Sequence, residues 1–334
     1  MQPNKKFITI ENNLTKIKQL LSELVLQPRM NVIKWSRITK QTPNIKIGYP
    51  GQHLASLITG MEGERTGARG NDLIDGSEVK SCSRIDQLDK CLNCGSPVAR
   101  LEAVCSNCNS DKIQRNNDSK WLFGIRNEED LDVLTRQVQR VVLILGDYPN
   151  FERDDFNTLR FQSFEIWTKS PRGARFVELM SNYYYKIYLG HKKKNIEKNP
   201  APKNFWPYSY QFYLCNPILT FSCVIKNASS NPIIKILNYT KPSEDRTKLS
   251  SVIMPVDVLT DDEIKLIFKK AKIDELSNMI KPSFTNKLAK AKSLSSLEKK
   301  EMLIGINETL RNYLPLRDTD KISISKSKYS RRIH

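Results

Sequence analysis

Residues 71–81 of the chain read NDLIDGSEVKS, and this short stretch decides how the centre of the protein is expected to fold. It has an Asp-Gly pair, Asp75-Gly76, in its middle, and such a pair is the strongest short-range signal for a tight β-hairpin. The preceding segment, MEGERTGARG over residues 61–70, is rich in glycine, which permits tight backbone turns. We therefore expect a loop that leads into a strand, a turn and a returning strand.

The charged residues of the predicted hairpin should converge. Successive side chains of a strand point to opposite faces, so Glu78 and Lys80 should share one face while Val79 points into the core. Folding of the hairpin brings Asp72 alongside them. Asp75 is the rival first carboxylate, but its position beside Gly76 is typical of a turn residue.

Two carboxylates and one ammonium group in a small volume suit metal-dependent phosphodiester hydrolysis. Mg²⁺ prefers a few carboxylate oxygens plus waters, and it offsets charge that develops on a phosphate. We therefore predict Asp72 and Glu78 as Mg²⁺ ligands and Lys80 as the group that orients the attacking water or stabilises the developing charge. The simpler interpretation is a solvent-exposed ion pair, because Glu-x-Lys is common on strands.

These residues carry a family resemblance. Asp72 followed after five residues by Glu78-Val79-Lys80 resembles the active-site pattern of the PD-(D/E)xK nuclease superfamily, in the short-hairpin form of some restriction and mismatch-repair endonucleases. The longer stretch YPGQHLASLITGMEGERTGARGNDLIDGSEVKSCSRIDQLDKCLNC, residues 49–94, is similar to the MamI family of type II restriction endonucleases. In this chain Asn71 replaces the proline that often precedes the first Asp, which leaves the choice of Asp less secure.

The resemblance implies a fold and an activity. The fold is α/β, with a mixed central sheet flanked by helices and with Asp, Glu and Lys on adjacent strands. The activity is cleavage of both strands of a specific DNA site by a homodimer. The competing hypotheses are a non-catalytic zinc-ribbon protein that binds nucleic acid, and a nuclease of DNA repair or of Holliday junctions.

Four of the seven cysteines form a separate pattern, Cys91-x2-Cys94-x10-Cys105-x2-Cys108. Two such pairs can close a tetrahedral Zn²⁺ site, and a closed four-thiolate site has no open position for catalysis. Iron in a rubredoxin-like site is the chemical alternative. We predict a structural zinc module inserted directly behind the cutting centre.

Composition favours a polyanionic partner. Lys and Arg number 54 against 36 Asp and Glu, a surplus of 18 positive charges, which favours a nucleic-acid partner, although basic proteins also bind anionic membranes or simply stay soluble. The family resemblance implies that this partner is double-stranded DNA. Candidate phosphate contacts near the module are Arg84, Lys90, Arg100, Lys112 and Arg115. The chain has no apolar run of ~18 residues that would span a membrane and no phosphate-cradling GKS/T loop. We expect no signal peptide, because residues 1–13 lack a continuous apolar stretch and a small-residue cleavage site. We expect a cytoplasmic protein without a nucleotide cofactor.

The pattern along the chain predicts an endonuclease core over residues 1–200, with the zinc module inserted at 86–120. Residues 201–334 should form a further mixed α/β region for DNA binding or dimerisation, ending in a basic tail. Helices are expected at 11–26, 50–60, 127–142 and 171–190, and strands at 141–145, 159–167, 208–220, 221–226 and 232–238. Glu165, on the second of these strands, is a weaker candidate for an additional metal ligand.

Overall fold

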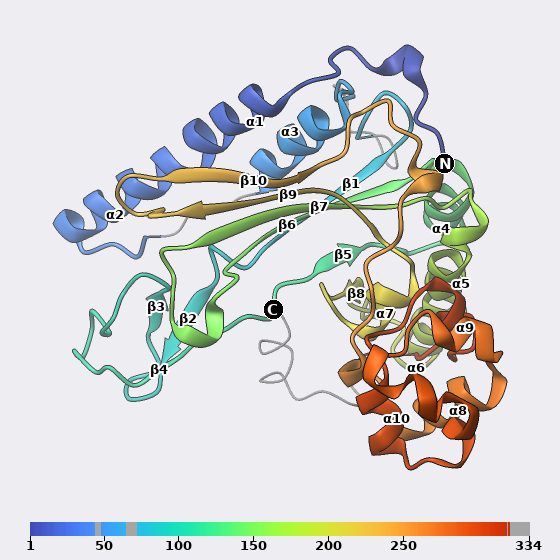
Figure 1. The fold of residues 1–334 in the computed structure, drawn as a ribbon. Helices are drawn as coiled ribbons and strands as arrows, with labels where there is room; N and C mark the ends of the chain where they lie inside the picture. Colours follow the sequence, from blue (N-terminus) through green and yellow to red (C-terminus); the bar gives the residue numbers. More distant parts are fainter. Residues whose placement is uncertain (44–47, 65–71, 319, 321–334) are drawn as a thin grey trace.

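A mixed five-stranded sheet forms the centre of the protein in the computed structural model (Figure 1). The structure describes residues 1–43, 48–64, 72–318 and 320; Asn71, most of the glycine-rich loop and the basic tail lie outside this part. The strands, in spatial order, are β1 (Glu78–Ser83), β6 (Val141–Asp147), β7 (Leu159–Ile166), β9 (Ile218–Lys226) and β10 (Ile233–Tyr239). β1 runs parallel to β6, and the other neighbours are antiparallel. The predicted mixed sheet is confirmed.

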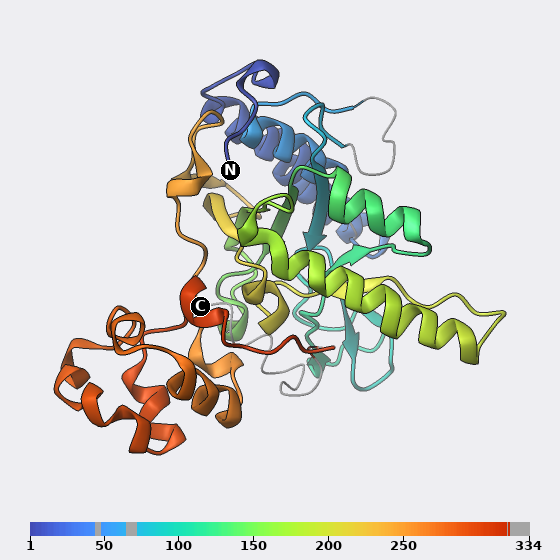
Figure 2. The ribbon, with the colours of Figure 1, turned by 90° about the vertical axis from the view of Figure 1, so that its right-hand side faces the viewer.

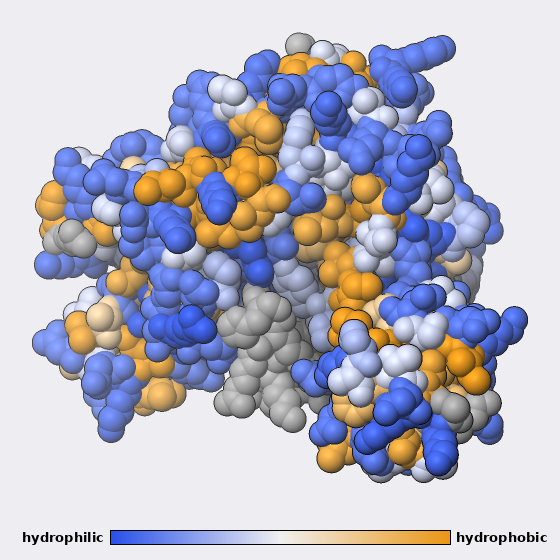
Figure 3. All heavy atoms as spheres, viewed as in Figure 1, coloured by the Kyte–Doolittle hydropathy of each residue, from blue (hydrophilic) through white to orange (hydrophobic). Residues whose placement is uncertain are grey.

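β6 is almost entirely apolar because both of its faces are covered. All residues of β6 are buried, as expected for a continuous apolar run between two layers. β1 and β10 are the edge strands. On one face of β10, Ile233 and Leu237 are exposed, and Figure 3 shows hydrophobic side chains gathered over this strand.

One layer of helices covers the upper face of the sheet in Figure 1. It consists of α1 (Leu14–Leu21), the π-helical turn η2 (Ser22–Leu26), α2 (Gln27–Thr39) and α3 (Gly48–Thr59). The first three form one continuous helix. The π-helical turn comes just before Pro28, which has no backbone N–H to donate and whose ring would clash with the carbonyl four residues earlier in a regular α-helix. Apolar residues of α1 and α3, including Ile17 and Leu54, pack against Val79 of β1 and its neighbours.

The opposite face carries a larger, aromatic core. The short strands β5 (Trp121–Phe123) and β8 (Lys203–Phe205) pair with each other there. The core also receives α4 (Glu128–Asp132), η3 (Val133–Gln137), α5 (Ala174–Asn182), η6 (Tyr183–Tyr188), α6 (Leu189–Lys194) and α7 (Tyr210–Leu214). α5, η6 and α6 form one long helix that crosses the view in Figure 2. The helix continues to Lys194, past the end expected at Gly190.

The C-terminal third adds helices to this same core. They are α8 (Asp261–Lys270), α9 (Ile273–Ser277), η9 (Pro282–Ser293), α10 (Ser296–Met302) and α11 (Glu308–Arg311). Capping boxes begin α8 at Thr260 and α10 at Ser295. Residues beyond 200 therefore supply two strands of the central sheet, β9 and β10, followed by helices.

The remaining elements are short. A separate three-stranded sheet of order β3-β2-β4 comprises β2 (Leu88–Cys91), β3 (Pro97–Ala99) and β4 (Ile113–Gln114). Single-turn helices are η1 (Lys5–Phe7), η4 (Phe151–Arg153), η5 (Pro171–Gly173), η7 (Arg246–Lys248) and η8 (Val256–Val258). No helix in the described part of the chain has the length and hydropathy needed to cross a bilayer.

Candidate active site and metal centre

The predicted turn is present, but the strand expected before it is reduced to isolated bridges at Leu73. Leu73 and Ser77 face each other as an antiparallel bridge, and Gly76 N–H donates to the Leu73 carbonyl at 2.9 Å. Gly76 has a φ of +76°, a conformation that residues with a Cβ rarely adopt. β1 begins directly after the bridge, so the turn fixes where Glu78 enters the sheet.

Asp72 is tied to the strand that carries the other two predicted residues. Its Oδ2 accepts a hydrogen bond of 2.7 Å from the backbone N–H of Val79. Since Glu78 N–H donates to β6, the N–H of Val79 points to the opposite edge of β1. Gln52 of α3 donates to Asp72 Oδ1 at 3.4 Å. No pattern in the sequence indicated Gln52, because only the packing of α3 against β1 brings it there.

Glu78 and Lys80 lie together on one face of β1. The Lys80 Nζ contacts Glu78 Oε1, and their side chains are 29% and 12% exposed, respectively. Val79 between them is buried. Both side chains line a cavity of about 230 Å³ on the α4 side of the sheet, together with Phe123 and Leu134. The structure thus brings two predicted residues into contact and ties Asp72 to the backbone between them.

Asp75 has a different environment. Its Oδ1 accepts a hydrogen bond of 3.1 Å from Ser77 N–H, and its Oδ2 pairs with Arg140 Nη2 at 3.1 Å. The side chains of both partners in this ion pair are almost fully buried. The side chain of Asp75 is therefore buried and paired with an arginine that holds the turn, whereas Asp72 is partly exposed and has no arginine partner among the contacts described above.

Glu165 is part of a buried ion network. Its Oε1 pairs with Arg140 Nη1 at 3.0 Å, and Arg246 reaches both of its oxygens at 3.3 Å. Trp167 Nε1 donates to Oε2 at 2.8 Å. Burial by itself would raise the pKa of Glu165, but the guanidinium groups of Arg140 and Arg246 hold it below its ordinary value. The Glu165 carboxylate is fully buried and bonded to two arginines and a tryptophan, so it is not available to a metal ion and its role is structural.

Arg140 links this network to the predicted active site. Its Nε donates to Ser77 Oγ at 2.9 Å, and its carbonyl accepts from Glu78 N–H at 3.1 Å. One buried residue, Arg140, therefore connects the turn, the start of β1 and Glu165 of β7.

The four predicted metal ligands come together in the small three-stranded sheet. The sulfur atoms of Cys91, Cys94, Cys105 and Cys108 all lie within 4.8 Å of one another. Cys91 Sγ is 3.6 Å from Cys108 Sγ, and Cys94 Sγ is 3.6 Å from Cys105 Sγ. A tetrahedral zinc site with Zn–S bonds of about 2.3 Å has sulfur atoms about 3.8 Å apart. The four thiols therefore fit such an ion.

The backbone of the two knuckles explains the spacing of the cysteines. Gly95 and Asn109 follow the second cysteine of each pair with φ of +76° and +55°. Each donates its N–H to the carbonyl of the first cysteine, at 3.0 and 2.8 Å. Hydrogen bonds from Ser96 and then Asn107 lower the pKa of the Cys94 thiol to about 5, which favours the thiolate that a metal needs.

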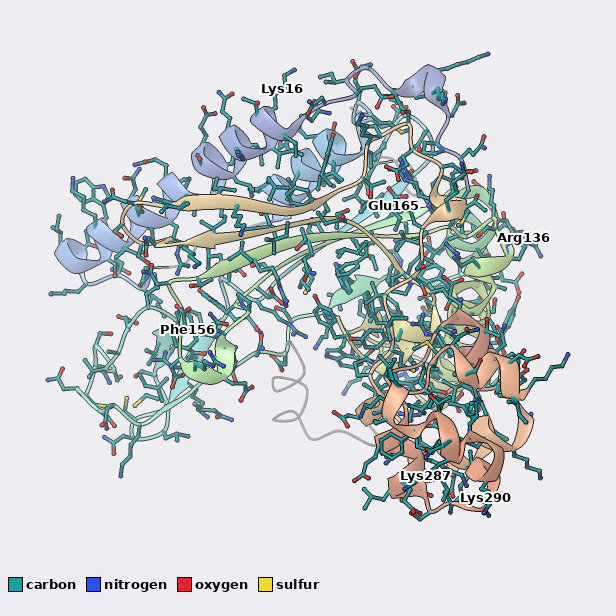
Figure 4. All side chains as sticks on the ribbon, viewed as in Figure 1. Lys16, Arg136, Phe156, Glu165, Lys287 and Lys290 are labelled. Carbon is teal, nitrogen blue, oxygen red and sulfur yellow. The ribbon has the colours of Figure 1, made fainter. Side chains whose placement is uncertain are left out.

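Buried arginines dock this module on the rest of the protein. Arg100 Nε and Nη2 bind the two oxygens of Asp89 at 2.8 and 2.7 Å. The guanidinium of Arg100 also lies over the rings of Tyr148, Phe151 and Phe156, at 4.9 to 5.5 Å from their centroids; Figure 4 labels Phe156 at this contact. Arg100 thus places a buried cation against three aromatic rings of the core, and Arg115 also lies over Phe156 at 5.0 Å.

Three of the five expected phosphate contacts are engaged within the fold instead. Arg84 and Arg100 are buried, and Arg115 pairs with Asp89 at 2.9 Å. Lys90 and Lys112 are exposed. The expectation was wrong for the three arginines because their charge, visible in the sequence, says nothing about burial.

Comparison with known proteins gives the family. A model of the MamI restriction endonuclease family matches residues 34–257, about two thirds of the chain. The chain belongs to the MamI restriction endonuclease family. The match includes the candidate active site, the cysteine cluster and all five strands of the central sheet.

A curated relative agrees with the family match. The chain is 31% identical to the Type II restriction enzyme MamI of Microbacterium ammoniaphilum over 83 residues, which are 25% of this chain and 27% of that enzyme. The alignment thus spans about a quarter of the curated relative. No solved structure matches the chain.

Proposed function

We propose that this member of the MamI family is a type II restriction endonuclease that cuts both strands of DNA at a specific site. The observation that carries the proposal is the placement of Glu78 and Lys80, in contact on one face of β1, with the Asp72 carboxylate bound to the backbone between them. Membership of a restriction endonuclease family supports it. The surplus of 18 positive charges supports a DNA partner.

The donor set suits Mg²⁺. Asp72 and Glu78 offer carboxylate oxygens, the ligands that this hard cation prefers, and both side chains are accessible to solvent in part. We propose that these two residues hold the ion. When bound, Mg²⁺ would lower the pKa of a coordinated water and offset negative charge on the scissile phosphate.

The protein's own contribution is position and charge. Lys80 Nζ, held beside Glu78, can donate a hydrogen bond to the attacking water or to a phosphate oxygen. Gln52 and the Val79 N–H hold the Asp72 carboxylate beside β1. Arg140 keeps the turn rigid through Asp75 and Ser77. The chain therefore orients its catalytic groups before DNA binds.

We propose that the cysteine cluster holds a structural Zn²⁺. The four thiols use every position of a tetrahedral ion, and the module that they close packs on the core through Arg100. Loss of the metal would release the three-stranded sheet, since apart from the cysteines its own core contains only Val98 and Ile113.

We also propose that the enzyme acts as a homodimer. A double-strand cut requires two scissions, and the described residues contain one Asp-Glu-Lys centre. The exposed Ile233 and Leu237 on the edge strand β10 support an interface there (Figure 3). Residues 201–334 are the region proposed for DNA binding or dimerisation; Lys287 and Lys290 are exposed on its surface (Figure 4).

The test is digestion of plasmid and phage DNA with Mg²⁺ by the wild type and by Glu78→Gln. We expect discrete fragments with the wild type and none with the variant. Glu178→Gln is the matched control, because Glu178 is also an acid in an ion pair, with Arg175 at 2.8 Å, but lies on α5. Sequencing of the fragment ends gives the recognition site and the stagger of the cut.

Other outcomes favour other functions. If the wild type and the variants bind DNA but none of them cuts it, the proposed nuclease activity is contradicted and a non-catalytic zinc-ribbon protein that binds nucleic acid is favoured. Cleavage only of branched DNA would favour a repair or junction nuclease. A comparison of Asp72→Asn with Asp75→Asn separates the two acids: we expect the first to abolish cleavage at unchanged stability and the second to lower stability.

A further inference from the structure

The cavity lined by Glu78 and Lys80 has a second charged wall. Arg126, from the segment that joins β5 to α4, and Asp130, from α4 itself, form this wall. Apolar side chains, among them Val133 and Val138, close the cavity behind these charges. Four charged side chains from two distant parts of the chain thus face the same space.

Asp130 is fixed from several directions. Its side chain is only 4% exposed. Its Oδ2 accepts hydrogen bonds from the backbone N–H of Arg126 at 3.0 Å and from Arg126 Nε at 3.2 Å. Its own N–H donates to the side chain of Asn127, the N-cap of α4, at 2.7 Å. A carboxylate anchored in this way holds the arginine at both its backbone and the base of its guanidinium.

The outer end of the guanidinium is accessible. The Arg126 side chain is 59% exposed, and among the described residues only its Nε makes a hydrogen bond. Nη1 and Nη2 therefore keep their donors, in a planar arrangement that matches the oxygen atoms of a phosphate. An arginine in this position, beside the cavity of the proposed active site, can bind a phosphate of the DNA backbone.

An ion pair nearby shows what an ordinary surface contact looks like in this protein. Arg136 pairs with Asp132 at 3.0 Å, with the same spacing of four residues. Its side chain is 82% exposed, Asp132 is 38% exposed, and neither lines the cavity. Figure 4 shows Arg136 at the outer edge of the molecule. The burial of Asp130 and the shared cavity distinguish the Arg126 pair.

We propose that Arg126 binds a phosphate of the DNA backbone in the same active site as Glu78 and Lys80, and that Asp130 is its positioning residue. This inference rests on the proposed nuclease function and adds a contact to it. The contact is with the backbone, so it contributes affinity and register without reading sequence.

The experiment measures binding without cleavage. A fluorescein-labelled duplex that contains the mapped cleavage site is titrated with protein in Ca²⁺, at several salt concentrations. We expect Arg126→Ala to weaken binding about tenfold, as loss of a charge-assisted contact does. It should also reduce the slope of log affinity against log salt by about 1. Arg136→Ala, the matched control, should leave affinity and slope unchanged, and Arg126→Lys should restore the slope.

Two further measurements isolate the contact. A series of duplexes each carries one neutral methylphosphonate at a different position near the cut. At one of these positions the substitution should weaken DNA binding by the wild type about tenfold and leave binding by Arg126→Ala unchanged. Asp130→Asn as a single substitution should weaken DNA binding. Added to Arg126→Ala it should cause no further loss of affinity, because Asp130 acts through Arg126.

The outcomes separate the inference from the proposed function. If the wild type cuts DNA and Arg126→Ala binds with the same affinity and salt slope as Arg136→Ala, the arginine inference is wrong and the nuclease proposal stands. If the wild type neither binds nor cuts DNA, the proposed function itself fails.

Discussion

The most informative stability prediction concerns Glu165, which lies near the end of β7, the middle strand of the sheet (Figure 4). Replacement of Glu165 by Gln keeps the shape of the side chain and removes its charge. Arg140 and Arg246 are both fully buried, and the carboxylates of Glu165 and Asp75 balance them. The variant would leave two buried guanidinium groups opposite one buried carboxylate.

The size of the effect follows from this imbalance. Removal of one partner from a buried ion pair costs about 3–5 kcal/mol, because a charge is left without compensation away from water. No cavity is created, since the amide fills the same volume. Trp167 can still donate to the amide oxygen, so that hydrogen bond is retained. We therefore expect the free energy of unfolding to fall by about 3–5 kcal/mol at pH 7.

The pH dependence gives a second check. The folded-state pKa of Glu165 lies below the ordinary value of 4.5, so its charge stabilises the protein fully above the unfolded-state pKa. That stabilisation is lost as pH falls through the folded-state pKa. The difference between wild type and variant should hold constant from pH 8 to about 5.5 and shrink below about 4.5.

The assay is urea unfolding followed by tryptophan fluorescence, with unfolding free energies compared at each pH. Glu178→Gln is again the control, since its side chain is 50% exposed and its ion pair should contribute at most about 1 kcal/mol. A Glu165→Gln variant within 1 kcal/mol of the wild type at pH 7 would refute the reasoning.

Four further predictions concern other parts of the fold. Cys94→Ser should reduce bound zinc from about one atom per chain to almost none, as measured by mass spectrometry of the metal content. Arg100→Ala breaks a buried ion pair and should lower the unfolding free energy by about 3–5 kcal/mol, with faster hydrogen exchange across residues 88–114. In Gly51→Ala, the new Cβ would lie 2.0 Å from Ser81 Oγ, so we expect a loss of about 1–3 kcal/mol in urea unfolding that Ser81→Gly partly restores. Thr260→Ala removes the cap of α8 and should cost about 1 kcal/mol in the same assay.

Each of these has a result that would contradict it. Retention of zinc by the Cys94 variant would show that this thiol is not a ligand. Unchanged exchange in the Arg100 variant would show that the module does not dock through this residue. A stable Gly51→Ala protein would mean that α3 can move away from β1, and an unchanged Thr260→Ala protein would mean that the cap is not needed.

Features that depend on neighbours in the sequence were predicted well. The alternation of Glu78, Val79 and Lys80 and the turn at Asp75-Gly76 both arise within about ten residues. The cysteine pattern also succeeded, because each knuckle is a local turn.

Local pattern failed where tertiary packing decided the outcome. The apolar run from Tyr208 was expected to be a strand, but residues 210–214 form α7. The Ser209 hydroxyl accepts from Phe212 N–H at 3.2 Å to start this helix, and Tyr210 and Phe212 pack into the aromatic core. A short apolar run suits a strand and a buried helix equally, so only the surroundings select one.

The sequence by itself determined which groups could do chemistry: the acids and lysine of the hairpin and the four thiols, because spacing along the chain fixes their local geometry. Only the tertiary structure decided which charges are exposed to solvent and which support the fold. Glu165 meets Arg246 across 81 residues and Asp75 meets Arg140 across 65, whereas the side chain of Arg126 is 59% exposed beside a cavity. Burial is set by packing between distant segments, and an arginine carries the same charge in the sequence whether it is buried or exposed.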